Sequence, residues 1–156
     1  MQRSHKDFYL VFIASLQVFL LLYFATIFEG LNLLQILGVV SLLSFLAVSN
    51  YQCVAHNFCH NVFFQSKALN VLFSIINTLA NTFPQTLFKY QHFNHHTSTN
   101  DKSISYGETK DRTSIFRYGK NVGKPEGFLS YSVKSPLRTD MVTLWQDTQK
   151  KRAGLN

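Results

Sequence analysis

Two long stretches without a charged residue dominate the first third of this chain and limit what it can fold into. The first covers residues 8–28 and the second about residues 33–54. About 20 consecutive apolar residues suffice to cross the hydrocarbon core of a membrane as a helix. The four residues between the stretches include Gly30, which favours a tight turn. The sequence therefore predicts an all-α fold that begins with an integral membrane helical hairpin.

A secretory signal peptide is the alternative for the first stretch. The stretch is too long for one, no small-residue cleavage site follows it, and a second apolar stretch begins almost at once. Arg3 and Lys6 precede the hairpin, Glu29 lies in its turn, and most other Lys and Arg residues follow it. Because cytosolic segments carry an excess of Lys and Arg, we expect a multi-pass protein with both ends of this segment in the cytosol. The endoplasmic reticulum and a bacterial inner membrane stay equally open.

The last third of the chain is basic and polar. Residues 101–156 hold 11 Lys and Arg against 6 Asp and Glu and account for most of the net charge of +7. Such a surplus can indicate nucleic acid, but after membrane spans it is the expected cytosolic pattern, so we expect no nucleic-acid partner. We divide the chain into residues 1–110 and a partly irregular cytosolic segment, 111–156. This segment is either a solvated loop or a surface for acidic head groups or an acidic electron carrier; a short helix capped by Thr139 or Asp140 is expected near its end.

Residues 68–83 predict another helix. The polar residues of this helix fall on one stripe: Asn70, Ser74, Asn77, Thr78 and Asn81. The remaining positions are almost all apolar. The segment is short for a full span, so we expect an amphipathic helix in the membrane interface, or a shallow re-entrant one, ended by Pro84. A third true span is the alternative, but it would place the histidines before and after it on opposite sides of the membrane.

Five of the six histidines lie between residues 56 and 96, in two groups: His56 and His60, then His92, His95 and His96. On a helix, residues three or four positions apart share one face, so each group can direct several imidazoles to one point. Imidazoles suit iron, zinc, copper or nickel rather than magnesium or calcium. We predict that all five histidines are metal ligands. Cys53 and Cys59 are expected to be reduced and are not assigned as ligands.

These motifs resemble those of the membrane-bound fatty acid desaturases and their hydroxylase and ketolase relatives. The resemblance consists of an H-x-x-x-H box (56–60) after a helical hairpin, a spacer of about 30 residues, and an H-x-x-H-H box (92–96), in that order. The run from Thr97 to Asp101 is also similar to the segment directly after the second box in that family. The resemblance covers roughly residues 8–110.

The resemblance implies two non-haem iron ions held almost entirely by histidines. They would use O2 and two electrons from a carrier, such as ferredoxin or a small haem cytochrome with its reductase, to introduce a double bond into the acyl chain of a membrane lipid or other acyl substrate. No catalytic group beyond the ligands is assigned. Ligand histidines are usually held by a further hydrogen bond, and four nearby residues are candidates for this role: Asn57, Asn61, Asn94 and Asp101.

Two departures from the family pattern affect this interpretation. Asn57 stands where desaturases commonly carry an acidic residue, and no histidine comes after His96, although the family needs a third box. We therefore expect an incomplete fragment or degenerate copy that is inactive alone. The alternatives are a lipid or carotenoid hydroxylase or ketolase, a non-catalytic membrane protein with a vestigial site, and a zinc-dependent hydrolase. The last is disfavoured because Asn57 cannot replace the glutamate base of an H-E-x-x-H motif.

Overall fold

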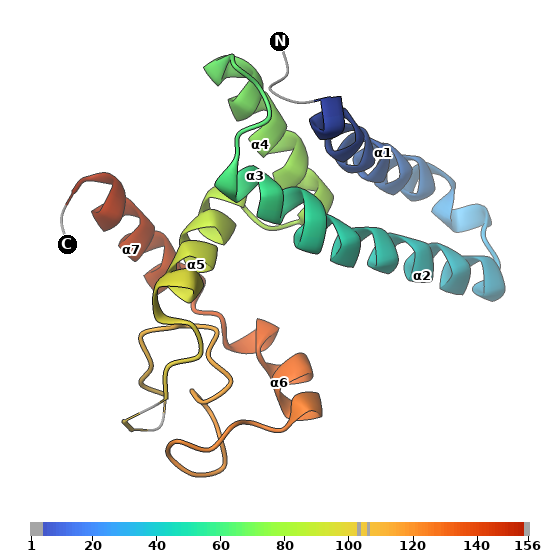
Figure 1. Cartoon of the computed structure of the whole chain (residues 1–156). Coiled ribbons are helices and arrows are strands. Elements are labelled where there is room, and N and C mark those ends of the chain that lie inside the picture. The colour runs from blue at the N-terminus through green and yellow to red at the C-terminus, as the bar shows by residue number, and fades with distance from the viewer. Residues whose placement is uncertain (1–4, 103, 106, 155–156) are drawn as a thin grey trace. The chain divides into compact units, whose positions relative to one another are not determined.

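The computed structural model describes residues 5–102, 104–105 and 107–154. Every extended regular element within these ranges is helical, and strand-like pairing there is limited to an isolated bridge between Ser105 and Glu108. The predicted all-α fold is thereby confirmed. The chain forms two compact units, residues 1–88 and 89–156, and Figure 1 shows the helices of both.

The first unit begins with the predicted hairpin. Helix α1 (His5–Ile27) is followed by a 3₁₀ turn, η1 (Phe28–Gly30), and by α2 (Leu33–Ser49). Asn32 starts α2 with a capping box, because its Oδ1 accepts from Gln35 N at 3.0 Å and Gln35 Oε1 accepts from Asn32 N at 2.9 Å. Two helical stretches, His5–Gly30 and Leu33–His60, are long and apolar enough to cross a membrane.

Their apolar surface has little protein cover. In the most apolar part of the two stretches, only 11% and 6% of the residues are buried within the protein. The central helix of a soluble protein would be mostly buried, because water would otherwise contact its apolar side chains. The low burial therefore favours the predicted membrane hairpin over a soluble core.

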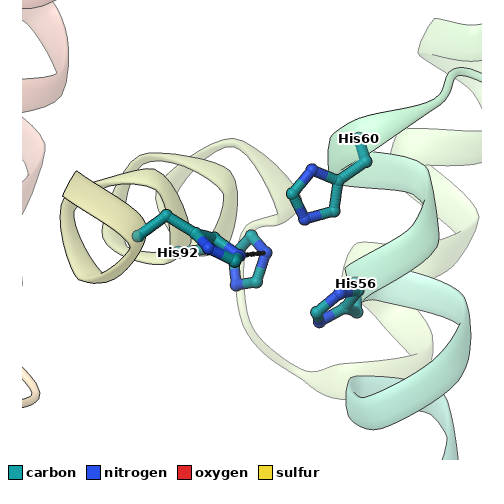
Figure 2. Close-up of side chains that lie close together, drawn as sticks. His56, His60 and His92 are labelled. Carbon is teal, nitrogen blue, oxygen red and sulfur yellow. Dashed lines mark hydrogen bonds between the residues drawn. The ribbon is translucent and has the colours of Figure 1, made fainter. Parts of the chain in front are cut away.

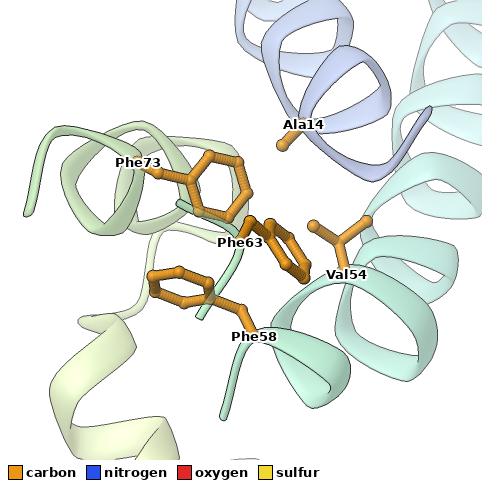
Figure 3. Close-up of a cluster of buried hydrophobic side chains, with 5 residues drawn as sticks. All are labelled: Ala14, Val54, Phe58, Phe63 and Phe73. Carbon is orange, nitrogen blue, oxygen red and sulfur yellow. The ribbon is translucent and has the colours of Figure 1, made fainter. Parts of the chain in front are cut away.

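The second helix continues past residue 54. Residues Asn50–Ala55 form a π-helical turn, η2, and α3 (His56–His60) follows without a break. Phe58 of α3 packs with Phe63 and Phe73, at ring-centroid distances of 5.1 and 4.9 Å. Ala14 and Val54 complete this buried cluster (Figure 3). The aromatic cluster fixes α3 against the rest of the unit.

Helix α4 (Lys67–Asn81) confirms the helix predicted near residues 68–83. It ends before Pro84, because Thr82 adopts a left-handed backbone with φ of 53°. Its polar stripe is turned inward: Asn77 is fully buried, whereas the apolar Ile75 and Leu79 on the other side are 53% and 56% exposed. The helix is thus inverted relative to a helix on a soluble core, with amides inside and apolar side chains outside.

A chain of amide hydrogen bonds connects three elements of this unit. Gln17 of α1 donates from Nε2 to Ala80 O at 2.7 Å and accepts from Asn50 Nδ2 at 3.0 Å. Asn50 Oδ1 in turn accepts from Asn81 Nδ2 at 2.8 Å. All three amide side chains are buried. The chain links α1, the π-helical turn and α4 without using a charge.

Helix α5 (Gln85–Ser98) begins in the first unit and ends in the second. The second unit also contains α6 (Phe128–Lys134), a 3₁₀ turn η3 (Pro136–Arg138) and α7 (Met141–Arg152). Asp140 caps α7 by accepting from Thr143 N at 3.0 Å, so the short helix expected near the end of the chain is confirmed with Asp140 as its cap.

Carboxylates organise the loops of the second unit. Asp101 accepts from Lys110 N and Asp111 N, each at 2.8 Å. Glu126, whose side chain is almost buried, accepts from Arg138 Nη1 with both oxygens, at 3.0 and 2.9 Å. Arg138 also lies over the Tyr118 ring, 4.5 Å from its centroid, beside a cavity of about 370 Å³. The cavity is bordered by charged and hydroxyl side chains rather than by an apolar core.

Candidate metal centre

The first histidine pair lies on the last turns of the second hairpin helix. His56 and His60 stand one helical turn apart on α3, and their ring centroids are 5.0 Å apart. Figure 2 shows both rings projecting from the same side of the helix. This is the arrangement predicted from the i, i+4 spacing, in which two imidazoles face one point.

The π-helical turn directly precedes this pair. A π-turn inserts an extra residue into an α-helix and rotates the rest of the helix beyond it, and such turns are frequent at functional sites. Here residues Asn50–Ala55 form the turn, and His56 is the next residue. The direction in which His56 and His60 point is therefore set by the π-turn and is not that of an uninterrupted α2.

A second pair lies on α5. The Nε2 atoms of His92 and His96 are 3.0 Å apart, with ring centroids separated by 4.5 Å. Figure 2 shows His92 projecting from α5. In this bond one ring donates an N–H and the other accepts, with the direction depending on the tautomers. Two Nε2 atoms this close face a common point.

His95 has a different environment. Its Nδ1 is 2.8 Å from Asp111 Oδ2 and 3.1 Å from Thr113 Oγ1. Asp111 is completely buried, so its carboxylate needs several donors. A neutral His95 that donates from Nδ1 to this carboxylate keeps its Nε2 lone pair available for a metal, as is usual for histidine ligands.

The Asp111 carboxylate is held ionised by its neighbours. Burial raises its pKa, but hydrogen bonds from the Asn100 and Thr113 backbone N–H groups, the Thr113 hydroxyl and His95 outweigh burial and bring the pKa below its ordinary value. The backbone donors lie at 2.9 and 2.8 Å. The carboxylate therefore stays charged at neutral pH and favours the Nδ1–H tautomer of His95.

Each of the four residues predicted to support the histidines makes a hydrogen bond to the backbone. Asn57 Nδ2 donates to Cys53 O of its own helix at 2.6 Å, and Asn61 ends α3 with its N–H bonded to Asn57 O. Asn94 accepts from Arg112 N and donates to Lys110 O, and Asp101 accepts from the backbone of residues 110 and 111. Asn94 and Asp101 thus hold the loop that carries Asp111.

Sequence reasoning missed Asp111, Thr113 and Gln85. Asp111 lies 16 residues beyond His95, and no periodic pattern connects the two. Gln85 lies outside both boxes, yet its Nε2 donates to Ala55 O at 3.3 Å and to Cys59 Sγ at 3.4 Å. The only local signal for the loop is that carboxylate and hydroxyl residues, such as Asp101 and Thr113, follow the second box.

The comparisons with known proteins agree with this geometry. A family model for fatty acid desaturases matches residues 31–154, a range that contains both histidine groups and most of the chain. No curated protein and no solved structure matches the chain. The chain belongs to the fatty acid desaturase family.

Proposed function

We propose that this chain supplies the first two histidine groups of an O2-dependent membrane oxidoreductase that introduces a double bond into the acyl chain of a lipid. One observation carries the proposal: this chain, which belongs to the desaturase family, has two histidine pairs, each on one face of a helix. The ring centroids are 5.0 Å apart within the first pair and 4.5 Å apart within the second. The first pair also ends a helix that is long and apolar enough to cross a membrane, which suits a lipid substrate.

The donor set fits iron. We assign His56 and His60 of α3 and His92 and His96 of α5 as donors to the metal, and His95, whose Nδ1 contacts Asp111, would contribute its Nε2. Neutral imidazoles bind iron without adding negative charge. When bound, a di-iron group supplies the oxidation of an unactivated C–H bond by O2, which no protein side chain performs unaided. Five imidazoles hold one iron well and two incompletely, so we expect this chain by itself to show no turnover.

The histidines would have two distinct tasks. His95 is held in one tautomer by Asp111 and Thr113. The Nε2 atoms of His92 and His96 lie 3.0 Å apart, so a metal bound by both of them would need each ring to carry its proton on Nδ1.

The membrane topology and the partners complete the proposal. The hairpin would have both ends in the cytosol, with Glu29 on the far side. The exposed lysines of the second unit, among them Lys120, Lys124 and Lys134, would attract an acidic electron carrier such as ferredoxin or a small haem cytochrome.

A membrane-impermeant maleimide tests the topology: in a Cys53→Ala background, Lys120→Cys should react from the cytosolic side and Glu29→Cys from the other. Equal labelling of both positions from one side would contradict the hairpin.

Metal identity is the first test of the function. The chain would be expressed with iron and zinc both present, purified in detergent, and its metals measured by mass spectrometry. We expect iron, which is lost in His56→Ala and His92→Ala and kept in His5→Ala, a histidine outside both groups. A zinc-loaded protein would favour a hydrolase, and a protein that binds no metal would favour a vestigial site.

Product analysis is the second test. Asn57 replaces the acidic residue common in desaturases and instead donates to Cys53 O, which also makes hydroxylation or ketolation on the same scaffold a candidate. In an enzyme completed with the missing ligands, loss of two hydrogens from the acyl chain indicates desaturation, and gain of an oxygen indicates the sibling reactions. Turnover by the isolated chain with iron and a reductant would overturn the prediction that it is inactive alone.

A further inference from the structure

Gln85 is a buried amide at the first position of α5. It is only 4% exposed, and both ends of the residue are anchored to α4. Its Oε1 accepts from Asn77 Nδ2 at 2.6 Å, and its backbone N donates to Thr78 Oγ1 at 3.1 Å. Asn77 is itself fully buried. The start of α5 is therefore fixed by two hydrogen bonds to one neighbouring helix.

The remaining side of the Gln85 amide reaches the first histidine box. Its Nε2 donates to Ala55 O at 3.3 Å and to Cys59 Sγ at 3.4 Å. Ala55 is the residue before His56, and Cys59 is the residue before His60. A single side chain thus contacts the backbone or side chain next to both histidines of the pair.

Gln85 lies on the same face of α5 as two histidines of the second box. At about 100° per residue, His92 and His96 each lie within about 20° of Gln85 around the helix, on either side of it, whereas His95 lies about 80° away from Gln85. His92 follows Gln85 by two turns, or about 10 Å. The face of α5 that binds α3 through Gln85 is therefore the face that carries His92 and His96. His95 faces Asp111 instead.

We propose that Gln85 is a positioning residue that sets the first histidine pair in register with the second. Its hydrogen bonds to Ala55 and Cys59 hold α3 against the first turn of α5, the helix that carries His92 and His96; we call this contact the clamp. The clamp is a neutral amide, which a low-dielectric environment tolerates better than a charge. This inference rests on the proposed function, because it assumes that the two pairs serve one metal centre.

The first test needs no metal. In the metal-free chain, Gln85→Met keeps the length and apolar volume of the side chain but removes its hydrogen bonds. We expect amide hydrogen exchange within residues 55–60 to accelerate about five- to tenfold, which corresponds to a net loss of about 1 kcal/mol of local stability. Gln91→Met is the matched control, on the same helix but a different face. Unchanged exchange in Gln85→Met would overturn the clamp.

The second test uses Co²⁺ as a probe for the histidine centre, with its visible absorption as the signal. We expect Gln85→Met to weaken Co²⁺ binding about tenfold or less and to alter the ligand-field spectrum, whereas Gln91→Met changes neither. In a His92→Ala background, Gln85→Met should cause little further loss, since the partner whose register it sets is gone. Additive losses would show that Gln85 acts only on general stability and would overturn the proposal.

Two controls separate the possible failures. If Gln85→Met does not fold, Asn77→Leu/Gln85→Met removes both partners of the buried bond and avoids an orphaned amide, while still lacking the clamp. If the unaltered chain binds no Co²⁺, the proposed function fails, and the exchange test still decides whether the clamp exists. If the chain binds Co²⁺ and Gln85→Met binds it equally well, only the positioning role fails.

Discussion

The two units of this protein bury polar groups of different kinds. The first unit uses neutral amides in its interior: Gln17, Asn50, Asn77, Asn81 and Gln85. The second unit uses carboxylates, with Asp111 fully buried beside His95 and Glu126 almost buried beside Arg138. Among the described residues, the buried carboxylates lie in the second unit and the buried polar side chains of the first unit are neutral.

The difference follows from the surroundings that each unit has to tolerate. A charge is costly far from water, whereas an amide can be satisfied by other amides and carbonyls. The first unit presents its apolar side chains outward and contains the two stretches that can cross a membrane. The second unit lines its cavity with Arg, Glu, Ser and Thr. Along the chain, the histidine groups lie where amide-based packing gives way to charge-based packing.

Removing the central carboxylate of the second unit should have the largest effect. Asp111→Ala leaves His95, Thr113 and two backbone N–H groups without their acceptor. A hydrogen bond to a charged group contributes about 1.5–3 kcal/mol, and this substitution removes several of them. We expect hydrogen exchange to accelerate in residues 99–102 and 107–117 while the hairpin is unchanged. Retained protection in this loop would contradict the central place given to Asp111.

Removing the central amide of the first unit should cost less. Asn50→Leu leaves Gln17 Oε1 and Asn81 Nδ2 unpartnered by Asn50, at a cost of about 1–3 kcal/mol. The expected readout is a lower thermal stability of the hairpin in detergent, measured by circular dichroism. Gln52→Leu, at an exposed neighbouring position, serves as the control. Equal stability of the two variants would show that the amide chain contributes nothing.

Acidification should distinguish the units without any substitution. The pKa of Asp111 and that of Glu126 lie below their ordinary values of 3.8 and 4.5, because hydrogen bonds and, for Glu126, Arg138 outweigh the effect of burial. Stability from these groups is complete above the unfolded pKa values and is lost as the pH falls through the folded ones. Below about pH 4.5, the second unit should lose exchange protection first. Simultaneous loss in both units would contradict the comparison.

Thr113→Val should have the smallest effect of the four changes. The substitution removes the hydroxyl that donates to Asp111 Oδ1 at 2.7 Å and lies 3.1 Å from His95 Nδ1, but keeps the side-chain shape. A loss of about 1 kcal/mol is typical for one such bond. We expect a correspondingly small fall in the chemical-denaturation midpoint of the second unit. An effect as large as that of Asp111→Ala would mean that the hydroxyl, not the carboxylate, organises the loop.

The sequence was sufficient for the features that depend on local periodicity. The uncharged runs predicted the hairpin, and the i, i+4 spacing predicted that His56 and His60 share a face, as do His92 and His96. Residues 68–83 predicted a helix, which the structure shows as α4. These features depend on helix geometry alone, so neighbouring residues determine them.

Features that depend on contacts between distant residues were not predictable. Nothing in the sequence marks residues Asn50–Ala55 as a π-turn, because hydrogen bonds to Gln17 and Asn81 hold Asn50 from other helices. Asp111 meets His95 only through a loop whose path Asp101 and Asn94 set. The supporting roles expected for Asn57 and Asn61 were proposed from proximity in sequence, whereas the Asn57 amide donates to Cys53 O of its own helix.

The most direct test of the account is an anaerobic Fe²⁺ titration of the purified chain, repeated for His56→Ala, His92→Ala and the double variant. If the two histidine groups form one centre, each single variant should lose most of the affinity, and the double variant should lose little more. His5→Ala should bind like the unaltered chain. Independent losses that add, or iron binding that survives both substitutions, would contradict the claim that the two pairs form one metal centre.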